Sequence, residues 1–495
     1  MSIINGANKT ILLFLAVCIL FCGNACASDD GVSNENETSG DAIPQTTAEV
    51  DADTGDMHEI AKGDWAGEEL MIMYIDWSLI SDYYFSEEAN GDAVNDAIFD
   101  RTARIEEYLN IDINSYTLGN TDTPHFNEIK KNVYAGDDVY DLTLIHNSSE
   151  ITKYVSDGIV KNWNDLPYID MTKSYWNESV QRNMEVEGVL AFASNDFILP
   201  DVNSIFFNKS LIKNLMLEDP FTLVNQGDWT WEQLIKMAES ASADINGDGI
   251  FDENDQYGFV GEYGWQLASI VTGCGQYTIQ TDDGQPKIVF NTEKMVSIIA
   301  MADTLLNEGN RSFTWPFSQA TDPNMGGTPP VSFDSGRALF YSVPLSLAPV
   351  FRATEVEFGI LPMPKFDSDQ QDYLSLNWAG FMCVPASSEN TELVGKTVEL
   401  LAYWNGQLVI PAFYNILLGQ KISRDTESQK MLDILFGNTI YDLGVNLGSE
   451  FYMVLPWTLD AGGNFASYYE KKIKTLEKIV EDYNKAHIEF KEAGA

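Results

Sequence analysis

The sequence is poor in basic residues. It contains 29 Lys and Arg residues against 75 Asp and Glu residues, which gives a formal net charge of −46 at pH 7. A surface of this sign repels the phosphate backbone of nucleic acids, so a nucleic-acid-binding function is excluded. The same acidity also keeps a protein soluble, and it does not by itself indicate a cationic ligand.

Histidines and catalytic motifs are also scarce. Four histidines are scattered along the chain, at His58, His125, His146 and His487. The sequence lacks H-E-x-x-H, G-x-S-x-G and glycine-rich phosphate loops, which would indicate a metalloprotease, a serine hydrolase or a nucleotide-binding enzyme. Carboxylate pairs for glycoside cleavage form in space rather than in sequence, and no pattern here selects such a pair. We therefore expect a protein that is not an enzyme.

Long apolar runs are confined to the first residues of the chain. A short segment with one positive side chain, residues 1–9, precedes an almost continuous apolar run at residues 10–22. This order is typical of a secretory signal peptide, which we place at residues 1–25. The run is too short for a permanent membrane anchor, and no later run approaches about 18 apolar residues. The mature protein is expected to be exported and not to be an integral membrane protein.

Two processing sites overlap after the apolar run. Gly23-Asn24-Ala25-Cys26 resembles a bacterial lipobox, with Gly23 in the position usually taken by Leu, and it predicts lipidation of Cys26. Ala25-Cys26-Ala27 also fits an ordinary signal-peptidase site, which would release a secreted protein. Residues 26–64 lack aromatic side chains and are rich in acidic and hydroxyl residues, so we expect a flexible stalk. A stalk favours the lipid-anchored form at the outer face of the membrane.

Cysteine is rare in the mature chain. The sequence has five cysteines, of which Cys18 and Cys22 lie in the signal peptide and Cys26 is the lipidation candidate. Cys274 and Cys383 remain, and they are far apart and in no metal-binding spacing. In an exported protein they either form a disulfide or stay as two buried thiols.

Strand and helix patterns alternate once the folded region begins near Trp65. The patterns predict, in order, strand, helix, strand, helix, strand and helix at residues 70–75, 96–109, 111–113, 126–133, 141–145 and 148–155. This alternation predicts an α/β fold with an open parallel sheet and helices on both faces. Ligands of such sheets bind beyond the carboxyl ends of the strands. Trp77, His146 and Asn147 directly follow strands and are expected at that edge.

A second unit begins around Asn203. Thr230 and Gln233 form a capping box that opens a helix at residues 231–241. Further patterns predict strands at 204–207, 257–259, 356–362 and 380–385, and helices at 294–308, 391–404 and 467–490. We find no internal repeat.

Several segments, in this order, resemble the extracellular solute-binding proteins of ABC importers, the class that includes maltose-binding protein. The matching segments are YDL at 140–142, SIFFNK at 204–209, DWTWEQL at 228–234, FDSGRA at 333–338 and LPMP at 361–364. Two later segments, RDTES at 424–428 and YDLG at 441–444, resemble a lipoprotein branch from Gram-positive bacteria. The resemblance covers about residues 68–457.

The resemblance implies a two-lobed, type II periplasmic-binding-protein-like fold with crossing hinge strands. The first lobe is expected at 66–202 plus 373–405, and the second at 203–372 plus 406–495. A monomer of this kind closes around a solute held in the cleft and delivers it to the permease subunits of an ABC transporter.

A twelve-residue loop, residues 244–255, has the spacing of a calcium-binding loop. Side-chain oxygens stand at loop positions one, three, five, nine and twelve, with glycine at six and a backbone carbonyl available at seven. The predicted ligands are Asp244, Asn246, Asp248, Ile250, Asp252 and Asp255. Since a strand rather than a helix is expected after Asp255, Ca²⁺ would have a structural role. The alternative is an acidic loop closed by Asx turns without an ion.

Carbohydrate sites combine aromatic platforms with carboxylates and amides that bind sugar hydroxyls. By position and by the resemblance, we predict that the ligand is bound by Trp77, His146, Asn147, Asp201, Glu262, Tyr263, Trp265, Trp378 and Trp457. For each tryptophan, packing in the core is the alternative.

The sequence thus predicts a lipid-anchored solute-binding protein that captures a carbohydrate, in particular an oligosaccharide. Two alternatives remain: the same fold binding a peptide or another polar solute, and a sensory or adhesion lipoprotein that acts through a membrane partner.

Overall fold

Two separate sheets organise the chain in the computed structural model, which describes residues 60, 62–76, 78–147, 150–252, 254–316, 331–418 and 426–494. The first sheet has the order β12-β3-β1-β2. Its strands are β1 (Glu68–Tyr74), β2 (Ile111–Tyr116), β3 (Leu142–Ile145) and β12 (Phe381–Cys383). β1, β2 and β3 run parallel, as the alternating pattern predicts, and β12 adds an antiparallel edge.

The second sheet has the order β10-β4-β9-β5-β8. Its strands are β4 (Asn203–Asn208), β5 (Tyr257–Tyr263), β8 (Ser312–Pro316), β9 (Ala338–Pro344) and β10 (Phe358–Leu361). β5 is parallel to β8 and β9, while β4 is antiparallel to β9 and β10. β4 and β9 are buried at every position. Such continuous burial is typical of strands covered on both faces and explains the apolar runs at 205–207 of β4 and 338–341 of β9.

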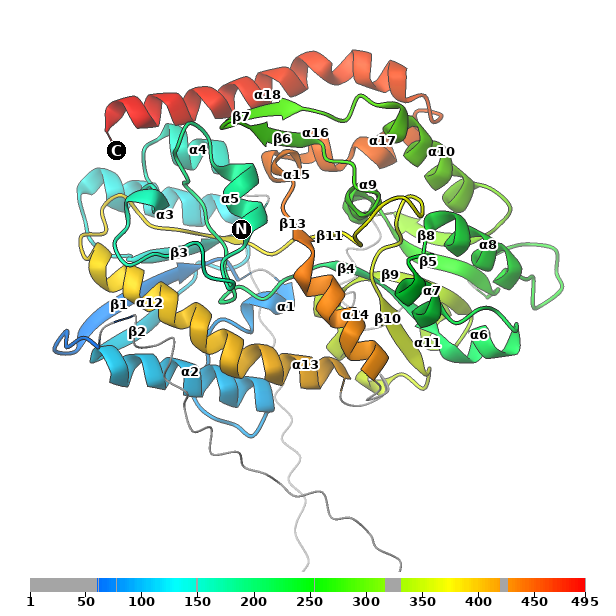
Figure 1. Cartoon of the computed structure of the whole chain (residues 1–495), viewed down its shortest axis with the longest axis horizontal. Coiled ribbons are helices and arrows are strands. Elements are labelled where there is room, and N and C mark those ends of the chain that lie inside the picture. The colour runs from blue at the N-terminus through cyan, green and yellow to red at the C-terminus, as the bar shows by residue number, and fades with distance from the viewer. Residues whose placement is uncertain are drawn as a thin grey trace, which may run out of the picture. The chain divides into compact units, whose positions relative to one another are not determined.

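Helices lie on both sides of the first sheet, with α2 and α12 on one side and α3 and α4 on the other (Figure 1). The elements are α1 (Ser78–Ser81), α2 (Ala93–Leu109), α3 (Asp122–Ala135), α4 (Ile151–Ser156), the 3-10 turn η2 (Trp163–Asp165), α5 (Glu178–Met184) and α12 (Thr391–Trp404). Predicted helices at 96–109, 126–133 and 391–404 are confirmed. In α2 the buried residues Val94, Ile98, Ile105 and Leu109 lie four or seven residues apart, which is the spacing of one face of a half-buried helix.

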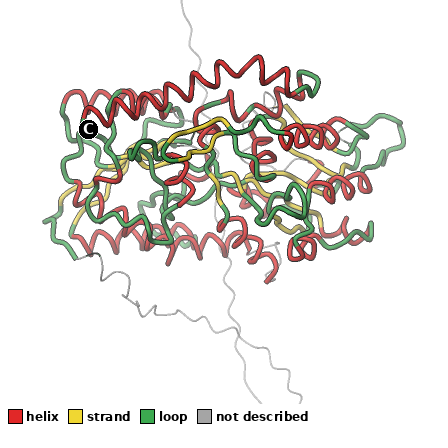
Figure 2. The backbone as a smooth tube through the Cα atoms, turned by 45° about the horizontal axis from the view of Figure 1, so that its top comes forward, coloured by secondary structure: helices red, strands yellow, loops and turns green. Residues whose placement is uncertain are grey.

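Shorter helices cover the second sheet, and the strands lie between helical layers (Figure 2). They are α6 (Lys209–Asn214), α7 (Pro220–Gln226), α8 (Trp231–Ala241), η3 (Trp265–Leu267), α9 (Ala268–Gly273), α10 (Glu293–Asn307), α11 (Val331–Asp334) and η4 (Leu345–Ala353). The N-cap of the predicted capping box at the start of α8 is confirmed, because the Gln233 amide donates to Thr230 Oγ1 at 3.3 Å. A hairpin of β6 (Ile279–Asp282) and β7 (Gln285–Ile288) was not predicted.

The C-terminal part of the chain, residues 405–493, returns across both lobes. It contains the π-helical turn η5 (Asn405–Val409), α13 (Ile410–Leu418), α14 (Thr426–Gly437), α15 (Leu443–Leu447), α16 (Ser449–Tyr452), α17 (Val454–Asp460) and α18 (Phe465–Ala493). α18 packs against α4 of the first lobe as well as against β7 of the second. Its contacts therefore extend beyond the second lobe, to which the resemblance assigns residues 406–495.

Three crossing segments, residues 199–203, 374–380 and 438–442, connect the lobes. They include the short parallel pair of β11 (Ser375–Leu376) and β13 (Thr439–Ile440) and a bridge between Val202 and Asn377. These segments give the two-lobed fold with crossing hinge strands that the sequence predicts.

Cys274 and Cys383 are both buried and unpaired, and they belong to different lobes. Of the two states considered for this pair, the structure therefore has two free thiols. Burial raises the pKa of both thiols, so neither is a ready thiolate.

Over the residues that the structure describes, none of the helices combines the length and the apolar character needed to cross a membrane.

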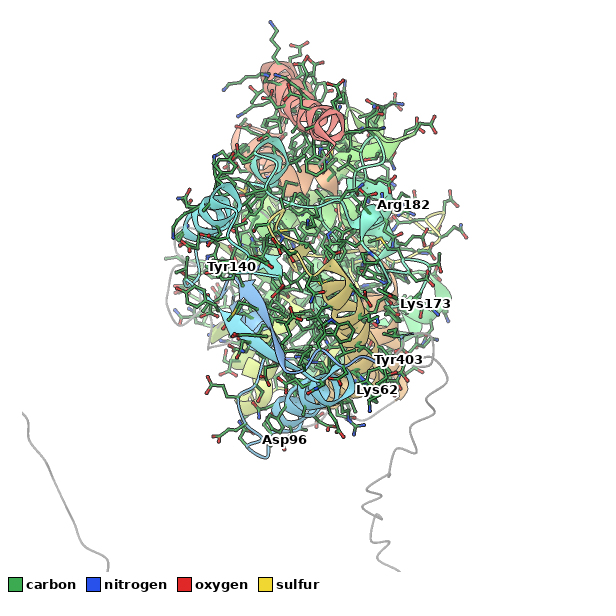
Figure 3. All side chains as sticks on the ribbon, turned by 90° about the vertical axis from the view of Figure 1, so that its left-hand side faces the viewer. Lys62, Asp96, Tyr140, Lys173, Arg182 and Tyr403 are labelled. Carbon is green, nitrogen blue, oxygen red and sulfur yellow. The ribbon has the colours of Figure 1, made fainter. Side chains whose placement is uncertain are left out.

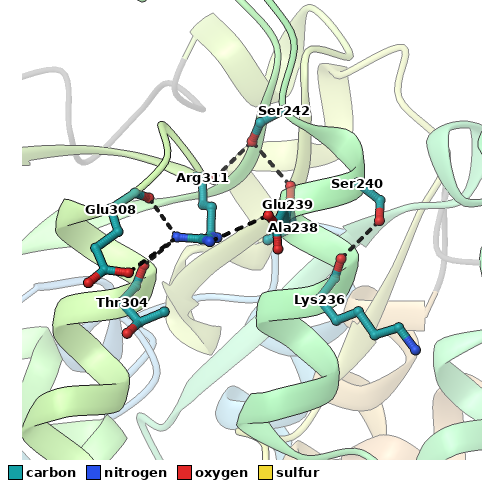
Figure 4. Close-up of polar contacts among 8 residues, drawn as sticks. All are labelled: Lys236, Ala238, Glu239, Ser240, Ser242, Thr304, Glu308 and Arg311. Carbon is teal, nitrogen blue, oxygen red and sulfur yellow. Dashed lines mark hydrogen bonds and ion pairs between the residues drawn. The ribbon is translucent and has the colours of Figure 1, made fainter.

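Arg311 joins two helices of the second lobe to the start of β8 (Figure 4). Its Nη1 donates to the carbonyls of Thr304 at 3.1 Å and Glu308 at 3.0 Å, at the C-terminal end of α10. Its Nη2 lies 3.5 Å from Glu239 Oε1 near the end of α8. Because helix C-termini carry partial negative charge, the guanidinium stabilises the end of α10, and its ion pair with Glu239 ties α8 to the same point.

We predict that Arg311→Met lowers the free energy of unfolding by about 2 kcal/mol, because charge-assisted hydrogen bonds to helix carbonyls are lost. Urea unfolding followed by circular dichroism measures this change. The matched control is Lys287→Met, whose exposed ion pair with Asp282 spans 2.8 Å and contributes less than about 1 kcal/mol. Equal effects of the two substitutions would contradict the role given to Arg311.

Candidate ligand-binding cleft

The crossing segments place Asp201 and Trp378 side by side. The Trp378 amide donates to the Asp201 carbonyl at 2.7 Å. Asn377 Oδ1 accepts from the Asp201 amide at 2.9 Å and from the Ala379 amide at 3.0 Å. These bonds fix the backbone at the point where the lobes meet, so both side chains have defined positions between them.

The carboxyl ends of β1 and β3 face these crossing residues. Asp201, Trp378 and His146 line a narrow cavity of about 10 Å³ together with Ile75, Ile80, Tyr84, Leu144, Ile145, Ala379 and Gly380. A space of that size holds about one water molecule. The structure therefore brings three of the predicted ligand-binding residues, His146, Asp201 and Trp378, to one place at the sheet edge.

An aromatic cluster lies next to Asp201. The rings of Trp265 and Trp378 meet edge to face, with centroids 4.7 Å apart, and Trp378 also contacts Tyr452 at 6.0 Å. Trp378 Nε1 lies 3.4 Å from Ser269 Oγ. Trp378 is only 6% exposed, so it acts largely as packing, whereas Trp265 is only partly buried. Trp265 is thus the ring of this pair that a ligand can reach.

Glu262 supplies a carboxylate at the end of β5. Its Oε2 accepts from Gln266 Nε2 at 2.9 Å. Its Oε1 is buried and has no hydrogen-bond partner among the described residues. Burial raises the pKa of Glu262 to about 7 and, less strongly, the pKa of Asp201 to about 6. Both carboxyls can accept or donate a hydrogen bond near neutral pH.

His146 and Asn147 occupy the turn after β3. Burial lowers the pKa of His146 to about 3, so the imidazole is neutral at physiological pH. Asn147 is fully buried, and neither polar atom of its side chain has a partner among the residues described. Its carbonyl accepts from Asn446 Nδ2 at 3.2 Å. Buried amides of this kind bind polar ligands or ordered water.

Tyr263 and Trp457, which were also predicted to bind the ligand, have other contacts. The Tyr263 hydroxyl donates to Asp460 Oδ1 at 2.9 Å, which ties β5 to α17. Lys472 Nζ of α18 lies 4.8 Å from the Trp457 ring centroid. Neither residue contacts Asp201 or Trp378 in the interactions found. Trp77 lies outside the described residues, as do Cys26 and the predicted signal peptide.

Four residues of the cleft were not predicted: Ser269, Ser346, Asn446 and Tyr452. Ser346 donates its amide to Asp201 Oδ1 at 3.4 Å. It follows β9 by two residues, so the strand-end rule would have found it had β9 been recognised. Tyr452 and Asn446 come from short C-terminal helices, and no sequence signal places them in the cleft.

The predicted calcium loop connects α8 to β5. Asp244 accepts from the amides of Gly247 at 2.6 Å and Gly249 at 2.8 Å. Gly247 has a φ of 74°, which its place in the tight turn requires. Asp255 is fully buried and accepts from the amides of Ile245 and Asp252, which closes the loop.

Each of these carboxylates is bound to backbone N–H groups, which is also the pattern of an Asx-turn loop. Among the residues described, no group of three or more His, Cys, Asp or Glu side chains is arranged to hold a metal ion. Glu253 lies outside those residues. Calcium binding by this loop therefore stays a prediction.

No protein-family model and no curated protein matches the sequence. Solved structures do match the fold. An ABC substrate-binding protein of Listeria monocytogenes in complex with cycloalternan superposes with a TM-score of 0.51 at 12% identity, covering 85% of this chain and 98% of that one. The lacto-N-biose-binding protein of a Bifidobacterium longum ABC transporter gives 0.51 at 14% identity, with 86% and 97% covered.

A cyclo/maltodextrin-binding protein complexed with maltotetraose gives a TM-score of 0.53 at 14% identity, again with 86% and 97% covered. At such low identity the similarity establishes the fold alone. The chain has the two-lobed α/β fold of these solute-binding proteins, as the sequence predicts.

The raised pKa of Glu262 predicts a pH-dependent stability. The folded state holds the proton more tightly than the unfolded state, so stability falls as pH rises from the ordinary pKa of 4.5 to about 7. Glu262→Gln removes this pH-dependent contribution to the free energy of unfolding. Between about pH 5 and pH 8, the wild-type free energy of unfolding should fall by roughly 2 kcal/mol more than that of the variant.

Urea unfolding at a series of pH values measures this difference. The matched control is Glu470→Gln, at an exposed position of α18, which should follow the wild-type curve. A Glu262→Gln curve parallel to the wild type would show that Glu262 ionises normally.

Proposed function

We propose that this protein captures a carbohydrate in the cleft between its lobes and delivers it to the permease subunits of an ABC importer. The observation that carries the proposal is the wall formed by Trp265, Glu262 and Asp201. The partly exposed Trp265 indole packs on Trp378, whose amide donates to the Asp201 carbonyl, and one carboxylate oxygen at the end of β5, Glu262 Oε1, has no hydrogen-bond partner in the described part of the chain.

This arrangement suits the chemistry of a sugar. The apolar face of a pyranose ring stacks on an indole, while its hydroxyls donate hydrogen bonds to carboxylates and amides. Buried acceptors such as Glu262 Oε1 and the Asn147 amide gain most from a ligand that brings donors, because unpaired buried polar groups are destabilising. The solved structures that share this fold contain cycloalternan, lacto-N-biose and maltotetraose, which supports the same class of ligand.

Binding of this kind requires movement of the lobes. Asp201 lies on a crossing segment, Asn147 on the first lobe and Glu262 on the second, so a ligand that touches all three favours the closed conformation. The closed form would then be the one that docks on the permease. None of these steps requires a chemical reaction, in agreement with the expectation that the protein is not an enzyme.

We further propose that the protein acts at the outer face of the cell membrane. A signal peptide at residues 1–25, a lipidated Cys26 and the acidic stalk at 26–64 would hold a monomeric body near its transporter. Cleavage within Ala25-Cys26-Ala27 without lipidation would give a secreted form.

The loop at 244–255 is proposed to bind Ca²⁺ in a structural role. Asp244, Asn246, Asp248, Asp252 and Asp255 supply oxygens at the required spacing, and the loop already has the glycine turn that such a site needs. An ion there would hold α8 to β5.

We predict that one saccharide series raises the melting temperature of the purified protein, since a ligand that binds only the native state stabilises it. Trp265→Ala should weaken that binding at least about tenfold, through loss of the stacking platform. Calorimetric titration measures the affinity, and Trp457→Ala, which lies beside α18, is the matched control. Stabilisation by peptides alone would contradict the carbohydrate assignment, and an unchanged affinity of Trp265→Ala would contradict the site.

Calcium has a separate test. We predict that removing Ca²⁺ with a chelator lowers the melting temperature by several degrees, because about 100-fold excess over the dissociation constant stabilises by roughly 2.7 kcal/mol. Asp248→Asn should abolish the response to the ion. Asp369→Asn, at an exposed position outside the loop, is the control and should keep the full response. An equal response in both variants would rule out the loop as the binding site.

A further inference from the structure

A second hollow lies on the opposite face of the crossing segments from Asp201 and Trp378. It is a groove with a volume of about 720 Å³, and its lining includes Pro200 and Asn377. Successive side chains of an extended chain point to opposite faces, so residues 200 and 377 face the groove while 201 and 378 face the cleft. The two hollows share the same backbone and not the same side chains.

Both lobes contribute to this groove. The first lobe supplies residues from 171–182 and 194–198, and the crossing segments supply residue 200 and residues from 374–377 and 438–440. Tyr277, Asp372 and Phe436 come from the second lobe. The labelled side chains Lys173 and Arg182 lie along one side of the molecule, away from Tyr140 (Figure 3). A volume of this size accommodates a ligand of about two or three sugar rings.

The groove contains a buried donor and a neighbouring, partly exposed acceptor, and neither has a hydrogen-bond partner among the described residues. Asn195 is 3% exposed, and its Nδ2 has no hydrogen-bond partner among the described residues. Its Oδ1 accepts from the Phe197 amide at 3.1 Å, which fixes the orientation of the side chain. The Asp196 carboxylate makes no hydrogen bond or ion pair with the described residues, and burial raises its pKa to about 7. An unpaired buried donor next to a partly exposed carboxylate without a protein partner is a place where a polar ligand or ordered water binds.

The turn that carries these two residues is held rigidly. Asn405, in the π-helical turn η5, donates from Nδ2 to the carbonyls of Asp196 at 2.8 Å and Phe197 at 3.1 Å. Asn405 Oδ1 in turn accepts from Arg101 Nη1 at 2.8 Å. π-helical turns of this kind occur often at functional sites. Because the backbone is fixed, the Asp196 and Asn195 side chains are preorganised for binding.

The pairing of donor and acceptor selects the ligand chemistry. An ammonium group only donates and a phosphate only accepts, whereas a hydroxyl does both. A hydroxyl can donate to the Asp196 carboxylate while it accepts from Asn195 Nδ2. Tyr175, Tyr277 and Phe436 supply aromatic surface in the same groove, which suits the apolar face of a sugar ring.

We propose that this groove, lined by Asn195 and Asp196, is a second binding site that takes a short saccharide or polyol and is distinct from the cleft. Since its walls belong to both lobes and to the segments between them, occupation of the groove changes the balance between open and closed conformations. By linkage, a ligand in the groove and a ligand in the cleft then alter each other's affinity by the same factor. The site itself does not depend on what the cleft binds.

The test uses a cysteine reporter in the groove wall, because Cys274 and Cys383 are buried and unreactive. Ser174→Cys places an exposed thiol in the groove, and Ser467→Cys on α18 places a control thiol outside it. Labelling by a maleimide is followed with maltose, sucrose, raffinose and sorbitol, each at about 50 mM, a level that detects millimolar binding. At least one of these compounds should slow labelling of Ser174→Cys by about threefold or more and leave Ser467→Cys unchanged.

Variants separate the groove from the cleft. In the Ser174→Cys background, Asp196→Leu should abolish the protection, while Trp265→Ala should leave it intact. Asp196→Asn keeps the side-chain volume and should weaken protection by about tenfold. This variant keeps the test valid if the leucine variant does not fold. Protection by none of the four compounds, or protection that survives both Asp196 substitutions, would overturn the proposal. Protection lost with Trp265→Ala would also overturn it, since the effect would then come from the cleft.

Discussion

The side chain of Asn377 holds the two lobes in their relation to each other. Its Oδ1 accepts from the amides of Asp201 and Ala379, and the Trp378 amide donates to the Asp201 carbonyl in the same stretch. The Asn377 side chain thus makes hydrogen bonds to backbone amides that a neighbouring strand would otherwise make where the two segments cross. Because side chains alternate along extended backbone, this arrangement decides that Asp201 and Trp378 face the cleft while their neighbours face the groove behind it.

The binding surfaces of this protein contain buried polar atoms that have no hydrogen-bond partner among the described residues. Glu262 Oε1, both amide atoms of Asn147 and Asn195 Nδ2 are buried without partners in the part of the chain that the structure describes. Each such group destabilises the fold by about 1–3 kcal/mol relative to a satisfied one. The apolar interior of both sheets, with β4 and β9 buried at every position, supplies the stability that tolerates them. The sites where buried polar groups lack hydrogen-bond partners are therefore the sites where we expect a ligand to bind.

Sequence reasoning located most of the scaffold because its signals are local. The helix at 93–109 and the strands at 68–74 and 142–145 follow from apolar periodicity, and the strand-end rule then brought His146 to the cavity beside Asp201. The position of a residue along a strand does not determine which groups its side chain contacts, however. Tyr263 ends the same strand as Glu262, yet its hydroxyl bonds to Asp460 of α17. Tyr452 reaches the cleft only through tertiary packing, and the groove at Asn195 and Asp196 depends on a π-helical turn that no propensity indicates.

The last helix has a mechanical consequence. α18 runs for 29 residues, or about 43 Å at the usual rise, and it rests on α4 of the first lobe and on β7 of the second. A straight rod seated on both bodies resists a motion that would pull them directly apart along its axis. It permits one body to swivel about the rod, since contacts between a helix and its neighbours shear more easily than they separate. A twist of one lobe against the other about the C-terminal helix therefore breaks the fewest of these contacts.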